Sequence, residues 1–181
     1  MAPSHRWIAR GALALLLALC VAALPALDAA STALARLAVF PFELQDASAA
    51  PAGDGERTAE IIALRSITSD ARDALQRSGR YSVINTEAAD TPAVHDHTLH
   101  SCDGCDAPIA LKLGADQSLV GVIVKVEPGS YAVEIKVRDA RSGKVVNSAR
   151  GTFLGGAAEW GGGVRSLLRH LLSDAAINPR G

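Results

Sequence analysis

The sequence predicts an α/β (α+β) domain in which helices pack on a mixed sheet of about five strands, in the order β-α-β-α-β-β-β-α. Two observations lead to this fold class. The first half alternates short apolar segments with segments of helical periodicity. Residues 117–153 instead form three strand-like segments separated by turn sequences, which is typical of an antiparallel meander. We expect one such domain over residues 36–175, because the chain of 181 residues is long enough for a single substantial core.

The first thirty residues are expected to act as a targeting segment rather than as part of the fold. The basic segment MAPSHRWIAR precedes the apolar run GALALLLALCVAALPAL, after which small residues follow. This pattern predicts a signal peptide over residues 1–30, which would direct the protein to the periplasm and leave no stable membrane span after cleavage. Cleavage is expected after one of three alanines, Ala29, Ala30 or Ala35.

Cys20 lies within the apolar run and directly follows Leu19. A lipoprotein signal requires a small residue immediately before its cysteine, so we expect a periplasmic protein without a lipid anchor. The mature chain would then keep two cysteines, Cys102 and Cys105. An even pair of cysteines in an exported protein first indicates a disulfide.

The first half of the domain contains a strand, a long helix and a second strand. RLAVFPFEL (36–44) predicts the first strand, with Pro41 at a bend or facing an unpaired side. Residues 56–78 predict the helix, because apolar residues recur at helical spacing, at positions 61, 64, 67, 71, 74 and 75. Gly79 is expected to end this helix in a left-handed conformation, and YSVIN (81–85) to form a short strand.

A polar loop and a short helix are expected next. Residues 86–104 predict the loop, and residues 106–113 predict the helix. Asp106 is expected to cap the first turn of this helix, and Gly114 to end it.

The second half of the domain is predicted to be a meander followed by a helix. Residues 117–126 are apolar at almost every position, which is typical of a strand buried on both faces. Residues 131–139 alternate between apolar and polar side chains and predict a strand with one solvated face, and residues 144–153 predict a third strand. The glycine-rich residues 154–163 are expected to connect this strand to the last helix, with Trp160 packed on the sheet. That helix, residues 164–175, has the apolar stripe Val164, Leu167, Leu168, Leu171 and Leu172.

The composition excludes several functional classes. The net charge of −1 and the lack of a basic stripe argue against nucleic acid as a partner. Neither a nucleophile elbow nor a phosphate-binding loop is found, and His170, beside the final leucine stripe, is expected to be a partly exposed structural histidine. The sequence therefore predicts no convergent catalytic set and no cofactor.

Four segments carry a resemblance to a known family. LAVFPFEL, the helix ending in SGRYSVI, CDGCDAPIALKLGAD and VGVIVKV resemble an uncharacterised family of exported bacterial proteins with a domain-of-unknown-function label. Members of that family are often encoded near quinoprotein alcohol-oxidation genes. The resemblance extends from about Arg36 to Leu172, and its most specific part is the cysteine pair before the alanine-rich helix.

A more distant resemblance concerns LGAD, the apolar strand after it and IKVRDARSGKVVNS. These segments are similar to the amino-terminal domain of TolB, and to periplasmic domains of the curli secretion pore and of penicillin-binding-protein activating lipoproteins. This resemblance implies an anticodon-binding-like fold that binds envelope proteins rather than catalysing a reaction. Fold alone does not determine function.

The segment HDHTLHSCDGCD (95–106) is the main candidate for chemistry, and its donors could hold a metal ion. The candidate ligands are imidazoles and thiolates that suit zinc or copper, namely His95, His97, His100, Cys102 and Cys105. Structural zinc sites usually take their ligands from two separated pairs, whereas these residues all belong to one loop. A solvated polar loop that contains histidines is therefore the favoured interpretation.

The two cysteines allow a redox or a structural interpretation. A catalytic thiol would lie at the start of the 106–113 helix, but nearby Asp96, Asp103 and Asp106 would raise its pKa and oppose activation. Asp106 also occupies the position of the histidine in a c-type haem motif. We favour a disulfide between Cys102 and Cys105 that fixes the loop onto the start of the helix, with Gly104 supplying backbone freedom.

The sequence thus supports two hypotheses. The first is an exported periplasmic accessory or binding protein without enzymatic activity, whose partners are periplasmic or envelope proteins. The alternative is a metal-binding or thiol-redox accessory protein of periplasmic quinoprotein metabolism that acts through residues 95–105.

Overall fold

The computed structural model describes residues 33–49, 52–86 and 89–177. From Leu34 onward these residues form one compact unit. The predicted signal peptide (1–30) and Cys20 lie outside the described residues. In the part of the chain that is described, no helix combines the length and the apolar character needed to cross a membrane.

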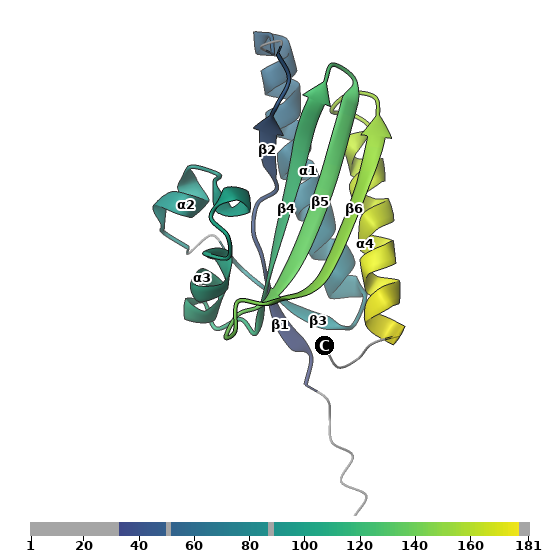
Figure 1. Cartoon of the computed structure of the whole chain (residues 1–181). Coiled ribbons are helices and arrows are strands. Elements are labelled where there is room, and N and C mark those ends of the chain that lie inside the picture. Colours follow the sequence, from purple (N-terminus) through teal and green to yellow (C-terminus); the bar gives the residue numbers. More distant parts are fainter. Residues whose placement is uncertain (1–32, 50–51, 87–88, 178–181) are drawn as a thin grey trace, which may run out of the picture. The chain divides into compact units, whose positions relative to one another are not determined.

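A six-stranded mixed sheet forms the centre of the domain (Figure 1). Its strands are β1 (Ala35–Val39), β2 (Glu43–Asp46), β3 (Tyr81–Ile84), β4 (Gln117–Glu127), β5 (Ser130–Asp139) and β6 (Val145–Leu154). Five strands follow the order β3-β1-β4-β5-β6, and β2 pairs with the second half of β4. The pairs among β1, β2, β3 and β4 are parallel, whereas β4, β5 and β6 form the predicted antiparallel meander. The predicted mixed α/β architecture is confirmed.

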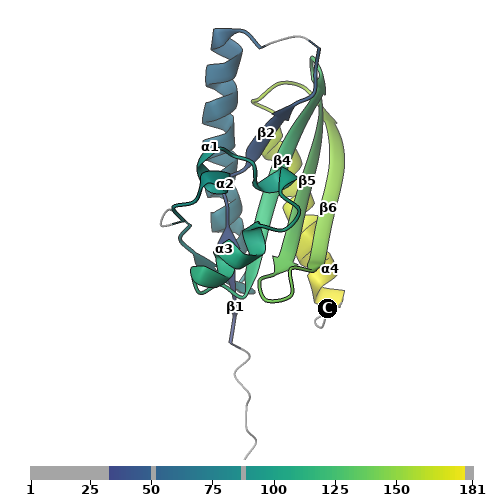
Figure 2. The same cartoon turned by 60° about the vertical axis from the view of Figure 1, so that its left-hand side comes forward.

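Helices cover the two faces of the sheet unequally (Figures 1 and 2). The long helices α1 (Asp54–Arg77) and α4 (Trp160–Ile177) pack on one face. The short elements α2 (Pro92–His95), η1 (Leu99–Ser101) and α3 (Asp106–Lys112) lie on the other face. They cover β1 and part of β4, so the β5–β6 end of that face stays open. As predicted, Gly79 and Gly114 follow α1 and α3 with positive φ angles of 68° and 81°.

The predicted strand 36–44 is divided into β1 and β2 at Pro41. Proline cannot donate a ladder hydrogen bond, and the N–H of Phe42 donates to Oγ1 of Thr68 on α1 (2.9 Å) instead of to a strand. The Phe42 ring lies against Gly121 of β4, where a Cβ atom would come within 2.2 Å of it. The sequence predicted one strand where the structure has two. Gly121 leaves room for the ring of Phe42, which lies between these two strands in the sequence.

The predicted buried stripe of α1 is correct in its C-terminal half only. Ile67, Ala71 and Leu75 are fully buried, but Ile61 is 51% exposed. Glu60 is buried beside it because it pairs with Lys125 of β4, whose side chain is 2% exposed. The apolar periodicity gives the wrong buried residue in the first half of α1, because a buried ion pair takes the place of an apolar contact there.

Helix α4 begins earlier than predicted. Residues 160–163 were expected to belong to a connector, yet they form the first turn of the helix. Trp160 is 2% exposed and packs edge-on against Tyr131 of β5, with ring centroids 5.1 Å apart. Gly163 lets the helix approach Phe153 closely, since a Cβ there would lie 2.9 Å from that ring. The glycines thus serve close packing as well as connection.

Candidate functional site

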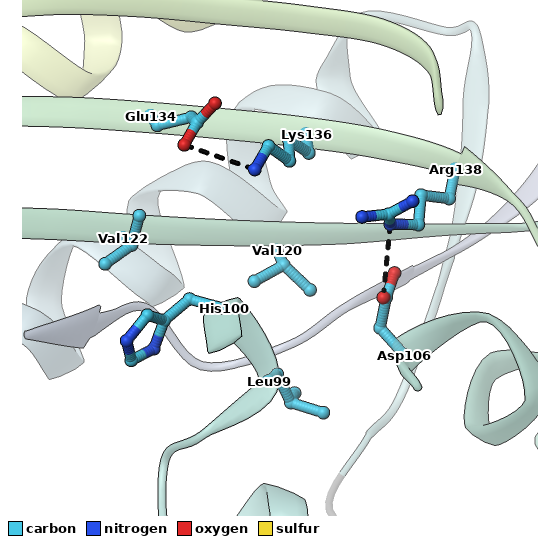
Figure 3. Close-up of a pocket in the computed structure, with 8 residues that line it drawn as sticks. All are labelled: Leu99, His100, Asp106, Val120, Val122, Glu134, Lys136 and Arg138. Atoms are coloured by element: carbon cyan, nitrogen blue, oxygen red, sulfur yellow. Dashed lines mark ion pairs between the residues drawn. The ribbon is translucent and has the colours of Figure 1, made fainter. Parts of the chain in front are cut away.

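A small open pocket lies on the sheet face that carries the short helices (Figure 3). Its floor is formed by β4 and β5, and its wall by η1 and the start of α3. The lining side chains are Leu99, His100, Asp106, Val120, Val122, Glu134, Lys136 and Arg138. Apolar groups from β4 and η1 thus meet a row of charged groups from β5.

Glu43 of β2 anchors one side of the pocket wall. Its side chain is 1% exposed, and its two carboxylate oxygens accept the backbone N–H groups of Leu99 and His100, at 2.9 Å each. Nδ1 of His100 lies 2.5 Å from Oε2 of the same carboxylate. A buried carboxylate is stabilised by such donors, so Glu43 fixes η1 on the sheet.

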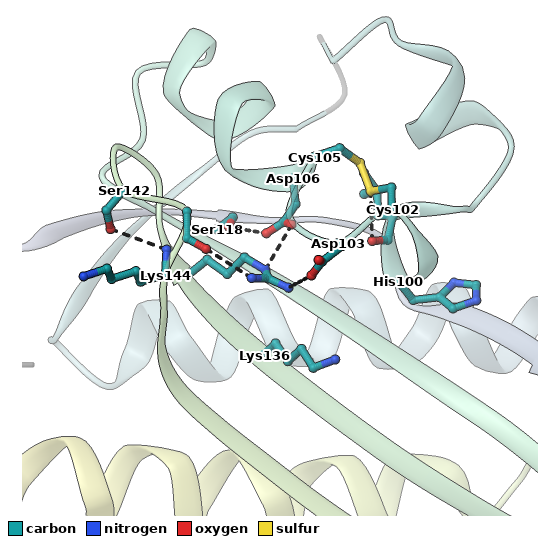
Figure 4. Close-up of polar contacts among 12 residues, drawn as sticks. His100, Cys102, Asp103, Cys105, Asp106, Ser118, Lys136, Ser142 and Lys144 are labelled. Carbon is teal, nitrogen blue, oxygen red and sulfur yellow. Dashed lines mark hydrogen bonds and ion pairs between the residues drawn. A yellow bond between two sulfur atoms is a disulfide. The ribbon is translucent and has the colours of Figure 1, made fainter.

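Asp106, at the start of α3, anchors the other side (Figure 4). The Ser118 hydroxyl donates to its Oδ2 (2.5 Å), and Nε of Arg138 lies 3.4 Å from its Oδ1. Asp106 was predicted to cap the helix through its side chain. That prediction is wrong, because the N-cap is Cys105 without a side-chain hydrogen bond, and the Asp106 carboxylate is buried toward β4 and β5.

Arg138 contacts three other segments of the chain. Besides Asp106, its guanidinium donates to the carbonyl oxygen of Gly143 in the β5–β6 turn (3.1 Å) and lies 3.7 Å from the exposed carboxylate of Asp103. A Cβ atom on Gly104 would lie 3.6 Å from this guanidinium. The arginine is therefore covered by the loop that the two cysteines close.

The sulfur atoms of Cys102 and Cys105 lie at disulfide-bonding distance, with their Cα atoms 5.7 Å apart. The residues between them both have positive φ angles, 41° for Asp103 and 100° for Gly104. Such angles are unusual for a residue other than glycine and turn the chain sharply from η1 into α3. Both cysteines are half-buried and pack against the small apolar cluster around Phe40, Leu99 and Ala110.

The histidines of the predicted metal set have separate surroundings. Nε2 of exposed His95 lies 2.7 Å from Asp90, His97 has a positive φ of 51°, and His100 contacts Glu43. Over the described ranges, the structure contains no group of three or more His, Cys, Asp or Glu residues placed to hold a metal ion. The structure thus joins the two cysteines to each other and gives His95 and His100 carboxylate partners.

Glu43, Ser118 and Arg138 were not identified as site residues from the sequence. Glu43 follows an apolar segment, and Arg138 belongs to the charged face of an alternating strand. In the sequence, Glu43 is 56 positions from its partner Leu99, and Ser118 is 12 positions from its partner Asp106. For Glu43 and Arg138 the sequence offers only one signal, a charged residue within or beside an apolar strand, and this signal does not show which residue the charge contacts.

Charged side chains of β5 and β6 continue beyond the pocket. Glu134 Oε1 lies 2.5 Å from Nη2 of Arg150, and Glu134 Oε2 lies 3.3 Å from Nζ of Lys136. Partial burial would raise the pKa of Glu134, but the hydrogen bonds from Arg150 and Lys136 hold this pKa below its usual value. Arg150 is 72% exposed.

Comparison with protein families gives one match. The model of the family described as DUF3280, protein of unknown function (DUF2380), matches residues 35–172. The predicted resemblance to a domain of unknown function is thereby confirmed. No curated protein matches the chain.

Several solved structures are similar to the chain. The LpoB C-terminal domain from Salmonella enterica is 13% identical, with 67% of this chain and 83% of that chain covered and a TM-score of 0.47. Lipoprotein GNA1162 from Neisseria meningitidis is 16% identical, with 80% and 97% covered and a TM-score of 0.45. TolB from Acinetobacter baumannii is 12% identical, with 81% and 29% covered and a TM-score of 0.45. Similarity at this level does not assign a partner or an activity to the chain.

Proposed function

The chain belongs to the DUF3280 (DUF2380) family of proteins of unknown function, and from the geometry of its pocket we propose that it is a non-enzymatic accessory protein of the cell envelope that binds another protein. The observation that carries this proposal is that the buried carboxylates at the pocket hold its wall in place. Glu43 binds two backbone N–H groups of η1, and Asp106 binds Ser118 and Arg138.

Groups in such contacts are poorly suited to catalysis. A general base must exchange a proton with a substrate, and a carboxylate that accepts several structural hydrogen bonds would lose them on protonation. Arg138 is likewise bound to Asp106 and Gly143. A rigid, charged sheet face beside a small pocket instead resembles a binding surface, where fixed polar groups give specificity.

An exported location agrees with two features of the chain. The sequence of residues 1–30 has the pattern of a signal peptide. The disulfide between Cys102 and Cys105 would persist in an oxidising compartment such as the periplasm.

The test uses the full chain with a tag at its C-terminus, produced from its own gene. Periplasmic contents are released by osmotic shock, treated with a lysine-reactive crosslinker and separated by size. We expect the chain in the periplasmic fraction and in a crosslinked complex with a second protein. Recovery in the cytoplasmic fraction, or only as uncrosslinked chain, contradicts the proposal.

The second candidate is a thiol-redox or metal-binding accessory protein of periplasmic quinoprotein metabolism. The thiol-redox version is favoured by the position of Arg138, whose guanidinium lies 3.6 Å from a Cβ position on Gly104, between the two half-buried cysteines. A nearby cation stabilises a thiolate. The metal form would use His95, His97, His100, Cys102 and Cys105. If the purified chain holds stoichiometric zinc or copper, and a triple His→Ala variant at positions 95, 97 and 100 loses it, the first proposal is contradicted and the second is supported. A metal-free disulfide with a very negative reduction potential would remove the second.

A further inference from the structure

We propose that the free edge of β6 binds an extended, acidic segment of the partner protein as an added strand. This inference rests on the proposed function and specifies the surface and the chemistry of the partner. It is carried by three features of β6: its unpaired edge, its exposed apolar ends and the excess positive charge at its centre.

Strand β6 ends the sheet. It runs for ten residues, Val145–Leu154, and within the described part of the chain it pairs with β5 alone. An edge strand presents unpaired N–H and C=O groups that can form a ladder with another chain. The opposite edge, β3, is only four residues long and offers far fewer such groups.

The β6 edge has few of the features that usually protect an edge strand, since its one irregularity, a register shift opposite Val137 and Arg138, is confined to its first residues. Natural proteins cover or shorten long edges, or place proline and several charges along them. The sequence VVNSARGTFL contains no proline and one charged residue, Arg150. Apolar side chains are exposed toward both ends, with Val146 38% and Leu154 79% exposed. A neighbouring strand with apolar residues at its ends would cover them.

The centre of the edge has an unbalanced charge. On the open face, Arg150 stands opposite Glu134 of β5, and Lys136 shares the same carboxylate. Two cations thus share one anion, and the outer one, Arg150, is 72% exposed at the edge. A strand added beside β6 would place a side chain next to Arg150 on its free side, where a carboxylate would be attracted and a cation repelled.

These features define the partner segment. It is extended, carries Asp or Glu at its centre and has apolar residues about four positions to either side, because Val146 and Leu154 flank Arg150 at that spacing. A second copy of this chain fits less well, since antiparallel pairing of β6 with itself would bring another Arg150 toward the same place instead of an anion.

The first test measures binding of short synthetic peptides to the full chain after its leader is removed. The probe alternates valine and threonine around a central glutamate and carries a fluorophore, and a matched peptide has lysine at the centre. By fluorescence anisotropy at low salt, we expect the glutamate peptide to bind about fivefold more tightly. Arg150→Glu should reverse this preference. The control Arg65→Glu, the same charge change at an exposed site of α1, should leave it unchanged. Equal binding of both peptides, binding of neither, or an unchanged preference in Arg150→Glu overturns the inference.

The second test locates the contact in cells. A photo-crosslinking amino acid replaces Thr152 on β6 or, as a control, Ile62 on the exposed side of α1. We expect an adduct with another protein from position 152 and none from position 62. An adduct from position 62 alone overturns this inference but leaves the proposed function standing, whereas no adduct at either site, together with a chain that elutes alone, contradicts both. An adduct of the chain with itself at position 152 assigns the edge to a second copy and also overturns the inference.

Discussion

Glu43 and His100 lie 57 positions apart in the sequence, and Oε2 of Glu43 accepts the backbone N–H of His100 at 2.9 Å. The same buried carboxylate accepts the N–H of Leu99, so one side chain of β2 holds the pocket wall. A carboxylate can accept at both oxygens, whereas an amide must direct an NH2 group toward one of these donors.

Replacement of this carboxylate should destabilise the domain. We expect Glu43→Gln to lower the free energy of unfolding by about 2 kcal/mol, because one hydrogen bond to a charged group is lost in a buried site. Urea unfolding at neutral pH measures the change. Glu127→Gln, at an exposed end of β4, should stay within about 0.5 kcal/mol of wild type. Equal stabilities for the two variants would show that Glu43 does not anchor η1.

The cysteine pair should be oxidised when the chain is produced in the periplasm. We expect no free thiol in the denatured, unreduced mature chain and two after reduction, as measured with a thiol-reactive dye. Because the ring between Cys102 and Cys105 is short, the double variant Cys102→Ser/Cys105→Ser should lose only about 2 kcal/mol of unfolding free energy. Two reactive thiols before reduction would refute the disulfide.

Replacement of the buried lysine of β4 should lower the free energy of unfolding. Lys125 Nζ contacts Glu60 at 3.3 Å and also pairs with Glu56; its hydrogen bond to Glu56 raises the pKa of Lys125 despite burial. Lys125→Met leaves the buried Glu60 without its cation, and we expect a loss of about 3–5 kcal/mol in urea unfolding. Adding Glu60→Leu removes the unpaired charge and should restore most of the loss. A double variant no more stable than the single one would disprove this account.

The Arg36–Asp116 pair predicts a pH dependence. The hydrogen bonds from the Arg36 side chain and backbone lower the pKa of Asp116 to about 2. A carboxyl whose pKa is lower in the folded state contributes stability above its unfolded pKa of about 3.9 and loses it as the pH falls toward 2. Both side chains are about half exposed, so solvent screens the pair and Asp116→Asn should cost less than about 1 kcal/mol at pH 6. This cost should vanish near pH 2, and an NMR titration of the Asp116 carboxyl above pH 3.5 would contradict the pairing.

The close contact of Phe42 with β4 makes Gly121 hard to replace. A Cβ at position 121 would meet the Phe42 ring at 2.2 Å, so Gly121→Ala should lower the free energy of unfolding by about 1–3 kcal/mol. Phe42→Leu removes the ring. In a double-mutant cycle, Gly121→Ala should therefore lower the free energy of unfolding less in the Phe42→Leu background than in wild type. Gly162→Ala on α4 has no atom within 4 Å and serves as the control, with stability unchanged or raised. A neutral Gly121→Ala would show that the ring moves without cost.

Local patterns predicted the elements whose partners are close in the sequence. The alternation in residues 131–139 and the turns around them gave β4, β5 and β6 with the correct pairing. Pro41 and the charged Glu60 and Lys125 were harder to interpret, because their roles depend on contacts with distant strands and helices. The pocket wall was missed for the same reason, since Glu43 and Arg138 act on segments that no local pattern connects to them.

The parallel half of the sheet has a consequence for the order in which the chain can fold. Strand β1 pairs with β3 and β4, and the contact between Arg36 and Asp116 spans 80 residues. The β4–β5–β6 pairings and the packing of α4 on β6 join segments that are close in the sequence, so we expect pulse-labelled hydrogen exchange to find β4, β5 and β6 protected before β1. During synthesis or export the amino-terminal end emerges first, and Phe40 and Phe42 then have no partner on β4. We therefore expect the nascent chain to be most prone to aggregation until β4 has emerged.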